Sequence, residues 1–470
     1  MAGVAQVTRQ VVTLVVFTLA VAACSADLDV TTVSGPGPET GPTSTPVTGD
    51  PGPSPTPGPD DPTPTPGSDD PGPTPTPGSV DPPPTPDPSQ DDLPYDTTIQ
   101  VSFDDVEAFW AEQLPAVFGI EFVPVNDKIP YRPSDPDTLP SCGGETAPPG
   151  VYRFNAFYCP PDDIIAWDDE GLFPYLYGQF GDFAIALVIA HEYGHAIQNR
   201  IESDFGPTIY QELQADCLAG AWGGTVDRGE SPTGITLSPS DLEEAIGGYL
   251  TFADPIGTPS DDPSAHGSGF DRVRAFGDGF FNGVGACADY LTDRPTVADI
   301  SLDEEDPNEG NMPLVDLEPL LQQDLDAWWN TEGADLLGID WNPPTLVPYR
   351  DGDAPTCDGQ TVSDDQARQR GFYCVADNVA AWDAGEFQRE LFGASGDMAA
   401  TYVILHLYGQ SVAAAEGVTD PAQVVLRADC LAGVWLGDVW VDGFDGHDIE
   451  LSAGDLDEAI VGAAAWVPHG

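Results

Sequence analysis

Apolar and polar positions divide the chain into segments of different character. A short apolar run covers residues 11–23, whereas residues 34–94 show no apolar periodicity at all. Further along, residues 181–198 and 401–412 carry apolar side chains at helical spacing, which predicts two buried helices. Beyond the N-terminal run the chain has no apolar stretch of 18 residues, so we expect no transmembrane helix.

The N-terminal run is typical of a signal-peptide core. Arg9 precedes it and Cys24 follows it directly, and 13 apolar residues are too few to span a bilayer. Val21–Cys24 resembles a bacterial lipobox, in which the cysteine is lipidated and becomes the new N-terminus. We therefore expect residues 1–24 to be a lipoprotein signal peptide ending at Cys24. Ordinary secretory cleavage beside an incidental cysteine is the alternative.

Residues 25–97 read as a disordered linker rich in Pro, Thr, Gly and Asp. Residues 34–94 hold 22 of the chain's 49 prolines, and such a composition cannot form a core. We expect an extended spacer that holds the following domains away from the membrane. Together with the lipid anchor, this predicts a protein on the extracellular face of a bacterial cell membrane.

The net charge of the chain excludes some classes of binding partner. The chain of 470 residues has 14 Lys and Arg against 79 Asp and Glu, a formal net charge of −65, of which −53 lies in residues 97–470. A nucleic-acid partner is not expected, because nothing could build a basic patch against phosphates. The acidity fits a saline habitat or an acid-biased secreted proteome, and the sequence does not separate the two. An apolar content of 40% suffices for packed cores.

Four short motifs recur at offsets of 213 to 219 residues. Phe157-Tyr158-Cys159 returns as Phe372-Tyr373-Cys374, and Ala215–Gly220 returns as Ala428–Gly433. Gly119–Phe122 and Leu242–Ile246 recur in the same way. We interpret this as one domain in two tandem copies, residues 98–290 and 315–470, joined by an acidic connector over 291–314.

The cysteines predict disulfides, which form outside the cytosol. Cys142 and Cys159 are 17 residues apart, as are Cys357 and Cys374, so each pair is expected to bond. Three cysteines besides Cys24 remain. Pairing Cys217 with Cys287 leaves Cys430 free, although a mixed pairing of these three is an open alternative.

The predicted helix over 181–198 contains the segment His191-Glu192-Tyr193-Gly194-His195. Histidines at positions i and i+4 share one helix face and can reach one metal ion, while Glu192 lies beside them within reach of a water. A polar helix turn is the bland alternative. The apolar flanks argue against it, because a buried polar cluster must be satisfied and a metal does that.

A second predicted helix, over 209–220, supplies the remaining parts of a site. Glu212 completes a His2Glu zinc set with one position left for water, and Asp216 can accept the outward N–H of a ligating histidine. The alternative is that Glu212 and Asp216 lie on a solvated helix face, but their apolar neighbours Leu213, Ala215 and Leu218 argue against it.

These motifs resemble the bacterial family described as "putative neutral zinc metallopeptidase". The resemblance covers about residues 140–290 and includes Asn155–Pro160, Val188–Gln198, Glu212–Gly220 and His266–Ser268 followed by Asp271-Arg272. It implies a zincin-like, gluzincin-like α+β domain that holds Zn²⁺ through His191, His195 and Glu212. Asp271 stands where the family pattern has Gln, which puts the local contact in doubt.

The predicted reaction is hydrolysis of peptide bonds by an endopeptidase with a zinc-activated water. Glu192 is the expected general base, and Tyr210 and His266 are the candidates for stabilising the oxyanion. The alternative for Tyr210 is that it only packs beside the ligand helix. For His266, a contact within its loop is as good an interpretation as a catalytic role. Residues 153–157 alternate and could form the strand that pairs with a substrate peptide, or an internal strand that carries Cys159.

The second copy departs from the motif. Its helix reads His406-Leu407-Tyr408-Gly409-Gln410, and Val425 stands at the position of the third ligand, while Asp429 is retained. We interpret it as a degenerate pseudopeptidase domain. The competing function is a non-catalytic envelope scaffold or binding lipoprotein with a vestigial zinc site.

Overall fold

The structure is a computed structural model. It describes residues 93–466 apart from 204–205, 299, 303–307, 309, 334–336, 351–352, 354, 363–369 and 443–446. The expected signal peptide, lipidation site Cys24 and nearly all of the stalk lie outside these residues. In the part that is described, none of the helices has the length and apolar character needed to cross a bilayer.

The first unit contains a three-stranded sheet. Its strands are β1 (Asp127–Tyr131), β2 (Ala156–Cys159) and β3 (Ile164–Asp168). β3 lies in the centre, parallel to β1 and antiparallel to β2. All five residues of β3 are buried, as its apolar run Ile-Ile-Ala-Trp dictates. β2 is therefore an edge strand, and its sequence position shows that the strand expected over 153–157 begins three residues later.

Helices make up the rest of this unit. They are α2 (Asp96–Gln113), α3 (Leu172–Phe180), α4 (Phe183–Arg200), α5 (Thr208–Asp227), α6 (Pro239–Thr251), α7 (Gly269–Asn282) and α8 (Val284–Asp289), with short turns η2 (Leu114–Phe118), η3 (Pro136–Thr138) and η4 (Pro149–Tyr152). α4 and α5 match the helices expected over 181–198 and 209–220. Small residues let the helices approach closely: a Cβ at Gly220 would overlap the carbonyl oxygen of Phe276 on α7.

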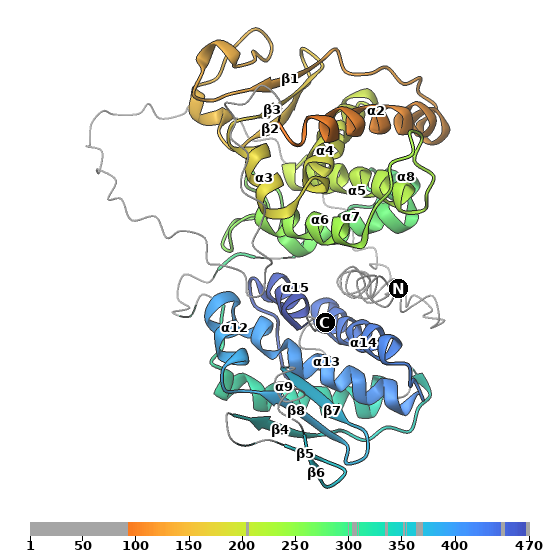
Figure 1. Cartoon of the computed structure of the whole chain (residues 1–470), viewed down its shortest axis with the longest axis vertical. Coiled ribbons are helices and arrows are strands. Elements are labelled where there is room, and N and C mark those ends of the chain that lie inside the picture. The colour runs from red at the N-terminus through yellow and green to blue at the C-terminus, as the bar shows by residue number, and fades with distance from the viewer. Residues whose placement is uncertain are drawn as a thin grey trace, which may run out of the picture.

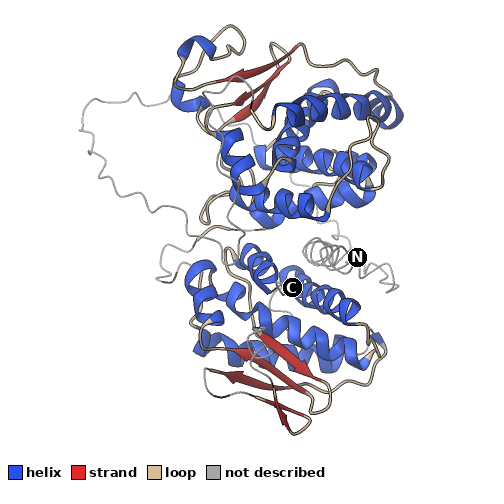
Figure 2. Ribbon diagram, viewed as in Figure 1, coloured by secondary structure: helices blue, strands red, loops and turns tan. Residues whose placement is uncertain are grey.

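The second unit also combines a three-stranded sheet with helices. Its elements are α9 (Leu314–Trp328), η5 (Trp329–Gly333), β4 (Thr345–Tyr349), β5 (Thr356–Cys357), β6 (Gln360–Thr361), β7 (Gly371–Cys374), β8 (Val379–Asp383), α12 (Phe387–Ser395), α13 (Asp397–Ala415), α14 (Pro421–Asp442) and α15 (Asp455–Trp466). α13 covers the helix expected over 401–412. The mixed α+β class expected from the sequence is confirmed (Figure 2).

The two main sheets have the same order and the same directions. In the first, β1-β3-β2, Tyr131 lies opposite Asp168; in the second, β4-β8-β7, Tyr349 lies opposite Asp383. Figure 1 shows these sheets at opposite ends of the long axis, with helices between them. The structural match follows the sequence motifs that recur between the units.

Three disulfides join the expected pairs, two of them predicted from the 17-residue spacing and Cys217–Cys287 from the cysteines that remained. Their Cα–Cα distances are 5.8 Å for Cys142–Cys159, 5.6 Å for Cys217–Cys287 and 5.7 Å for Cys357–Cys374. Cys430, which this pairing left over, is also disulfide-bonded. The expectation of a free thiol at Cys430 is therefore wrong.

The units contact each other through α7 and α15. The carboxylate of Asp457 accepts hydrogen bonds from the backbone N–H groups of Gly269 and Phe270, at 2.9 and 2.7 Å. Asp457 thereby caps the first turn of α7, where unpaired N–H groups and the helix dipole favour a negative charge. The Phe270 ring packs edge-on against Trp440 of α14, 5.1 Å between centroids.

Candidate metal centre

Two neighbouring helices place the predicted ligands. α4 is apolar on nearly every side, so it lies in the core, and its His191 and His195 emerge one turn apart on the side that faces α5. Gly194, between them, lies so close to Ala215 that a Cβ would meet the α5 backbone at 2.9 Å. This close approach brings Glu212, one turn before Asp216 on α5, to the two imidazoles.

The three ligand atoms form a compact triangle. Nε2 of His191 lies 3.1 Å from Nε2 of His195 and 3.2 Å from Oε2 of Glu212, and the remaining side measures 3.4 Å. Ligands of a tetrahedral zinc at bond lengths of about 2.0–2.1 Å are separated by about 3.3 Å. The donor set and its spacing therefore fit a zinc ion, with a fourth corner left open.

Polar partners hold the imidazoles in this orientation. Nδ1 of His191 lies 2.7 Å from Oδ1 of the buried Asp216, so the outward nitrogen donates and Nε2 is free to bind a metal. Nδ1 of His195 lies 2.9 Å from Oε1 of Gln198. Asp216 in turn receives two hydrogen bonds from Arg272 of α7, at 2.9 and 3.0 Å.

The charges of the cluster favour a cation at its centre. Burial alone lowers the pKa of His191, but Asp216 and Glu212 outweigh it and raise that pKa to about 10. Burial raises the pKa of Glu212, yet the two histidines hold it well below its usual value. Glu212 is thus ionised, and a bound cation would replace the protons that its charge draws to the imidazoles.

A cavity of about 860 Å³ opens beside the triangle. Its walls include His191, His195 and Glu212, together with Glu192. Glu192 is buried, and burial raises the pKa of its carboxyl group, with the two histidines opposing the rise. A carboxylate of raised pKa at the wall of such a cavity is suited to accept a proton.

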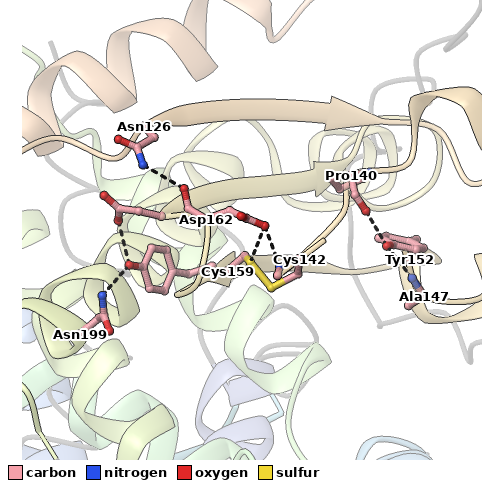
Figure 3. The surroundings of a disulfide bond; sticks show 11 residues. Asn126, Pro140, Cys142, Ala147, Tyr152, Cys159, Asp162 and Asn199 are labelled. Carbon is pink, nitrogen blue, oxygen red and sulfur yellow. Dashed lines mark hydrogen bonds between the residues drawn. A yellow bond between two sulfur atoms is a disulfide. The ribbon is translucent and has the colours of Figure 1, made fainter. Parts of the chain in front are cut away.

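The edge strand β2 forms another wall of the cavity, through Ala156, Phe157 and Tyr158. Figure 3 shows how the strand is fixed: Cys159 bonds to Cys142, and Asn199 of α4 donates a hydrogen bond of 3.0 Å to the hydroxyl of Tyr158. Sheet, disulfide and α4 therefore hold the edge of β2 next to the triangle, where the backbone of Tyr158 donates a hydrogen bond to the carboxylate of Glu192.

The two candidates for stabilising an oxyanion differ in position. His266 borders the cavity with its side chain half exposed, and its Nδ1 lies 3.7 Å from Asp254. Tyr210 is not among the described residues that line the cavity, and its ring packs under the guanidinium of Arg294. A role of Tyr210 in the reaction therefore stays a prediction.

Two residues of the site were missed by sequence reasoning. Arg272 appeared only as part of a motif, with no partner named, and its place on Asp216 depends on the packing of α7 against α5. Tyr249 of α6 borders the cavity, and its buried hydroxyl lies near the carboxylate of Asp216. Burial raises the pKa of Tyr249 well above its usual value, so the hydroxyl stays protonated.

Comparison with known proteins finds a match for part of the chain. The model of the family described as "Putative neutral zinc metallopeptidase" matches residues 141–290, a range that includes His191, Glu192, His195 and Glu212. An uncharacterized protein of Mycobacterium tuberculosis is 32% identical over 162 residues, which is 29% of this chain and 54% of the relative. The uncharacterized protein YpfJ of Escherichia coli K12 is 32% identical over 174 residues, 31% of this chain and 55% of that protein.

The match is limited in length. The chain spans about half the length of these curated relatives. No solved structure matches the chain significantly. What the comparisons support is a likeness of residues 141–290 to a family that is described by its zinc and its peptidase activity.

Proposed function

We propose that this chain is a zinc-dependent endopeptidase. The observation that carries the proposal is the triangle of His191, His195 and Glu212, whose sides of 3.1, 3.2 and 3.4 Å fit one tetrahedral zinc. A purely structural zinc would have four protein ligands and no need of a base. Here a cavity adjoins the open corner, and Glu192 lies in its wall.

The residues of the chain divide the chemistry among them. When bound, zinc supplies Lewis acidity, which lowers the pKa of water and polarises a carbonyl group. Glu192 takes the proton of the attacking water and delivers it to the leaving amine. The raised pKa of Glu192 serves both steps, because a carboxylate of low proton affinity would be a poor base.

The edge strand β2 provides a place for the substrate. An extended peptide can add to the unpaired edge of a sheet through backbone hydrogen bonds. The walls that Phe157 and Tyr158 contribute would then receive its side chains. Tyr249 and His266 border the same cavity and can donate a hydrogen bond to an oxyanion.

The second unit is proposed to be a degenerate copy of the first. Its sheet has the same order, and its His406 lies 2.5 Å from Asp429, as His191 lies beside Asp216. In place of a second histidine, Gln410 contacts Nε2 of His406 at 3.0 Å, and Leu407 is buried where the base would stand. A single histidine cannot hold a catalytic zinc, so this unit is expected to bind none.

The proposed location is the outer face of the cell membrane, with a lipid on Cys24 as the attachment. This lipid competes with a disulfide at Cys24, because the three disulfides above use every other cysteine except Cys430, which is itself bonded. The support for the location is the lipobox-like Val21–Cys24 and the disulfides, which form in oxidising compartments. Cys24→Ala should move the protein from the membrane fraction to the soluble fraction. Retention of the variant on membranes would show that something other than a lipid holds it there.

The proposed reaction is tested by two substitutions in the full chain. Glu192→Gln keeps the shape of the side chain but removes the proton acceptor, so we expect zinc to stay bound and activity to fall about 10²–10⁴-fold or more. Glu212→Ala removes a ligand, so zinc and activity should be lost together. Zinc by elemental analysis and cleavage of a peptide library are the measurements.

Glu202→Gln is the matched control. Glu202 lines the same cavity but is exposed, so the same chemical change there should leave both zinc and activity within a few-fold of the unmodified protein. Full activity of Glu192→Gln would contradict the assignment of the base. A zinc content of two per chain would contradict the degenerate second unit.

A further inference from the structure

Three buried carboxylates lie together in the second unit, where α13 and α15 begin. Asp397 begins α13, and Asp455 and Glu458 lie in the first turn of α15. Their exposed fractions are 3%, 5% and 6%. One oxygen atom from each lies within 4.8 Å of the others, so all three can reach one point.

Hydrogen bonds satisfy these carboxylates incompletely. Oδ2 of Asp397 accepts a hydrogen bond from the backbone of Met312 at 2.6 Å, and Oε2 of Glu458 accepts one from Met398 at 2.9 Å. Asp455 accepts from the N–H and hydroxyl groups of Ser452. Oδ1 of Asp397, however, is buried and receives no hydrogen bond from an N–H or hydroxyl group of the described residues, and the polar side chains beside Asp397 are the carboxyl groups of Asp455 and Glu458. A buried carboxylate oxygen in this state is costly, and each such atom calls for an explanation.

The cluster also lacks a positive charge. Across the part of the chain that the structure describes, no Lys, Arg or His pairs with any of the three carboxylates, and the charges that act on them are one another's. Burial and this mutual repulsion raise the pKa values of Asp455 and Glu458 to about 8. Near neutral pH either protons or a bound cation must therefore offset the repulsion among the three carboxylates.

We propose that Asp397, Asp455 and Glu458 bind one Ca²⁺ ion. The donors are all oxygen atoms, which hard cations prefer, and no histidine or cysteine belongs to the group, so zinc is not the matching metal. Calcium tolerates irregular sets of six to eight oxygens, whereas magnesium demands a near-ideal octahedron. The side-chain oxygen of Asn311, which accepts from the backbone of Asp397 at 2.9 Å, lies close enough to the cluster to be a further oxygen in its surroundings.

The cluster reaches a cavity through Glu458. A second cavity, of about 900 Å³, is bordered by Asn311, Gly396 and Glu458. An ion can enter from there with water molecules that complete its coordination. The same cavity is bordered by Asp457, which caps α7 of the first unit.

The position gives the ion a structural consequence. α15 holds two of the carboxylates and also Asp457, and Met312, near the end of the connector, donates a backbone hydrogen bond to Asp397. Calcium would therefore fix the start of α13, the start of α15 and the end of the connector to one another. That arrangement supports the contact between α15 and α7.

The full chain is the object of the test, with zinc restored in buffers freed of other divalent cations by a chelating resin. Titration calorimetry with CaCl₂ should show about one tight site per chain, and calcium should raise the melting temperature more than an equal concentration of MgCl₂ does. Glu458→Gln should weaken calcium binding at least tenfold. It should also melt higher than the unmodified protein when calcium is absent, because it removes part of the repulsion.

Asp261→Asn is the matched control, since it removes one exposed carboxylate and should leave calcium binding unchanged. Asp397→Asn repeats the test if Glu458→Gln does not fold. A melting temperature that calcium does not change would overturn the proposal and leave protons as the occupants of the cluster. Equal effects of calcium and magnesium on all variants would also overturn it, because that pattern is screening of surface charge.

Discussion

At the scale of single residues, Asp216 links the metal centre to the rest of the fold. One of its oxygens faces His191, and the guanidinium of Arg272 contacts both. Burial would raise the pKa of Asp216, but Arg272 and His191 outweigh it and lower that pKa, so the carboxylate is ionised. Its charge makes His191 a better donor of electrons toward a metal at Nε2.

Asp216→Asn is expected to weaken zinc binding about 10–100-fold, the usual cost of losing a partner of a ligating histidine. The amide keeps the shape but not the charge, and it leaves Arg272 buried without its counter-ion. Competition with a fluorescent zinc chelator measures the affinity. Asp429→Asn, the equivalent change in the second unit, should leave the affinity unchanged, and equal losses in both variants would contradict a specific role for Asp216.

At the scale of elements, the close packing of α5 against α7 brings Arg272 into contact with Asp216, which in turn contacts His191. α5 carries Glu212 and Asp216, and α7 carries Arg272, so their separation decides whether the ion pair forms. Gly220 and Gly224 of α5 and Gly279 of α7 lie where a Cβ would overlap the backbone of the partner helix. Glycine is required at these positions because the helix backbones touch.

Gly220→Ala should destabilise the fold by several kcal/mol, because the methyl group forces the two helices apart in a packed core. Chemical denaturation would show a lower midpoint, and zinc affinity should fall with it. Gly285→Ala is the control: this glycine of α8 has open space around its Cβ position, so the change should be neutral or slightly stabilising. Equal stability of the two variants would mean that α5 and α7 are not in contact.

The first turn of α7 also predicts a dependence on pH. Burial raises the pKa of Asp271 to about 6 from an ordinary value of 3.8. Since the folded state holds the proton more tightly than the unfolded state, the protonated form stabilises the fold below pH 3.8, and this contribution is lost as the pH rises through about 6. Asp271→Asn should therefore gain up to about 3 kcal/mol of stability above pH 6 and nothing below pH 4.

Denaturant titrations at pH 4 and pH 8 would measure this difference. Asp278→Asn, on the same helix, serves as a comparison at a carboxylate that accepts a hydrogen bond from Tyr290 at 2.6 Å, so its loss should lower stability. A gain for Asp271→Asn that is the same at both pH values would contradict burial of its charge as the cause.

The sequence was most informative where spacing alone determines geometry. Histidines at i and i+4 on α4, and Glu212 and Asp216 at i and i+4 on α5, could be found because a helix fixes which side chains share a face. Arg272, Tyr249 and the buried carboxylates could not be found in this way, since each depends on how separate helices pack. The prediction of a free thiol at Cys430 was wrong because pairing cysteines by elimination assumes that the partners of all the other cysteines are known.

At the scale of the whole molecule, net charge dominates. Residues 97–470 carry a charge of −53, and basic residues are too few to neutralise it. The negative charges on such a surface repel one another, and this repulsion destabilises the compact state. Added salt screens the repulsion. The Debye length falls from about 30 Å at 0.01 M to about 10 Å at 0.1 M and about 3 Å at 1 M.

The melting temperature should therefore rise by several degrees between 0.02 and 0.5 M NaCl, in buffers without divalent cations. Most of the rise should come below about 0.3 M, because the Debye length changes little beyond that concentration. Salts that act by exclusion from the protein surface would instead raise the melting temperature steadily to molar concentrations. NaCl and KCl should behave alike, since screening depends on ionic strength, and a melting temperature that stays constant up to 0.5 M would mean that the acidic side chains are too far apart or too well hydrated to repel one another.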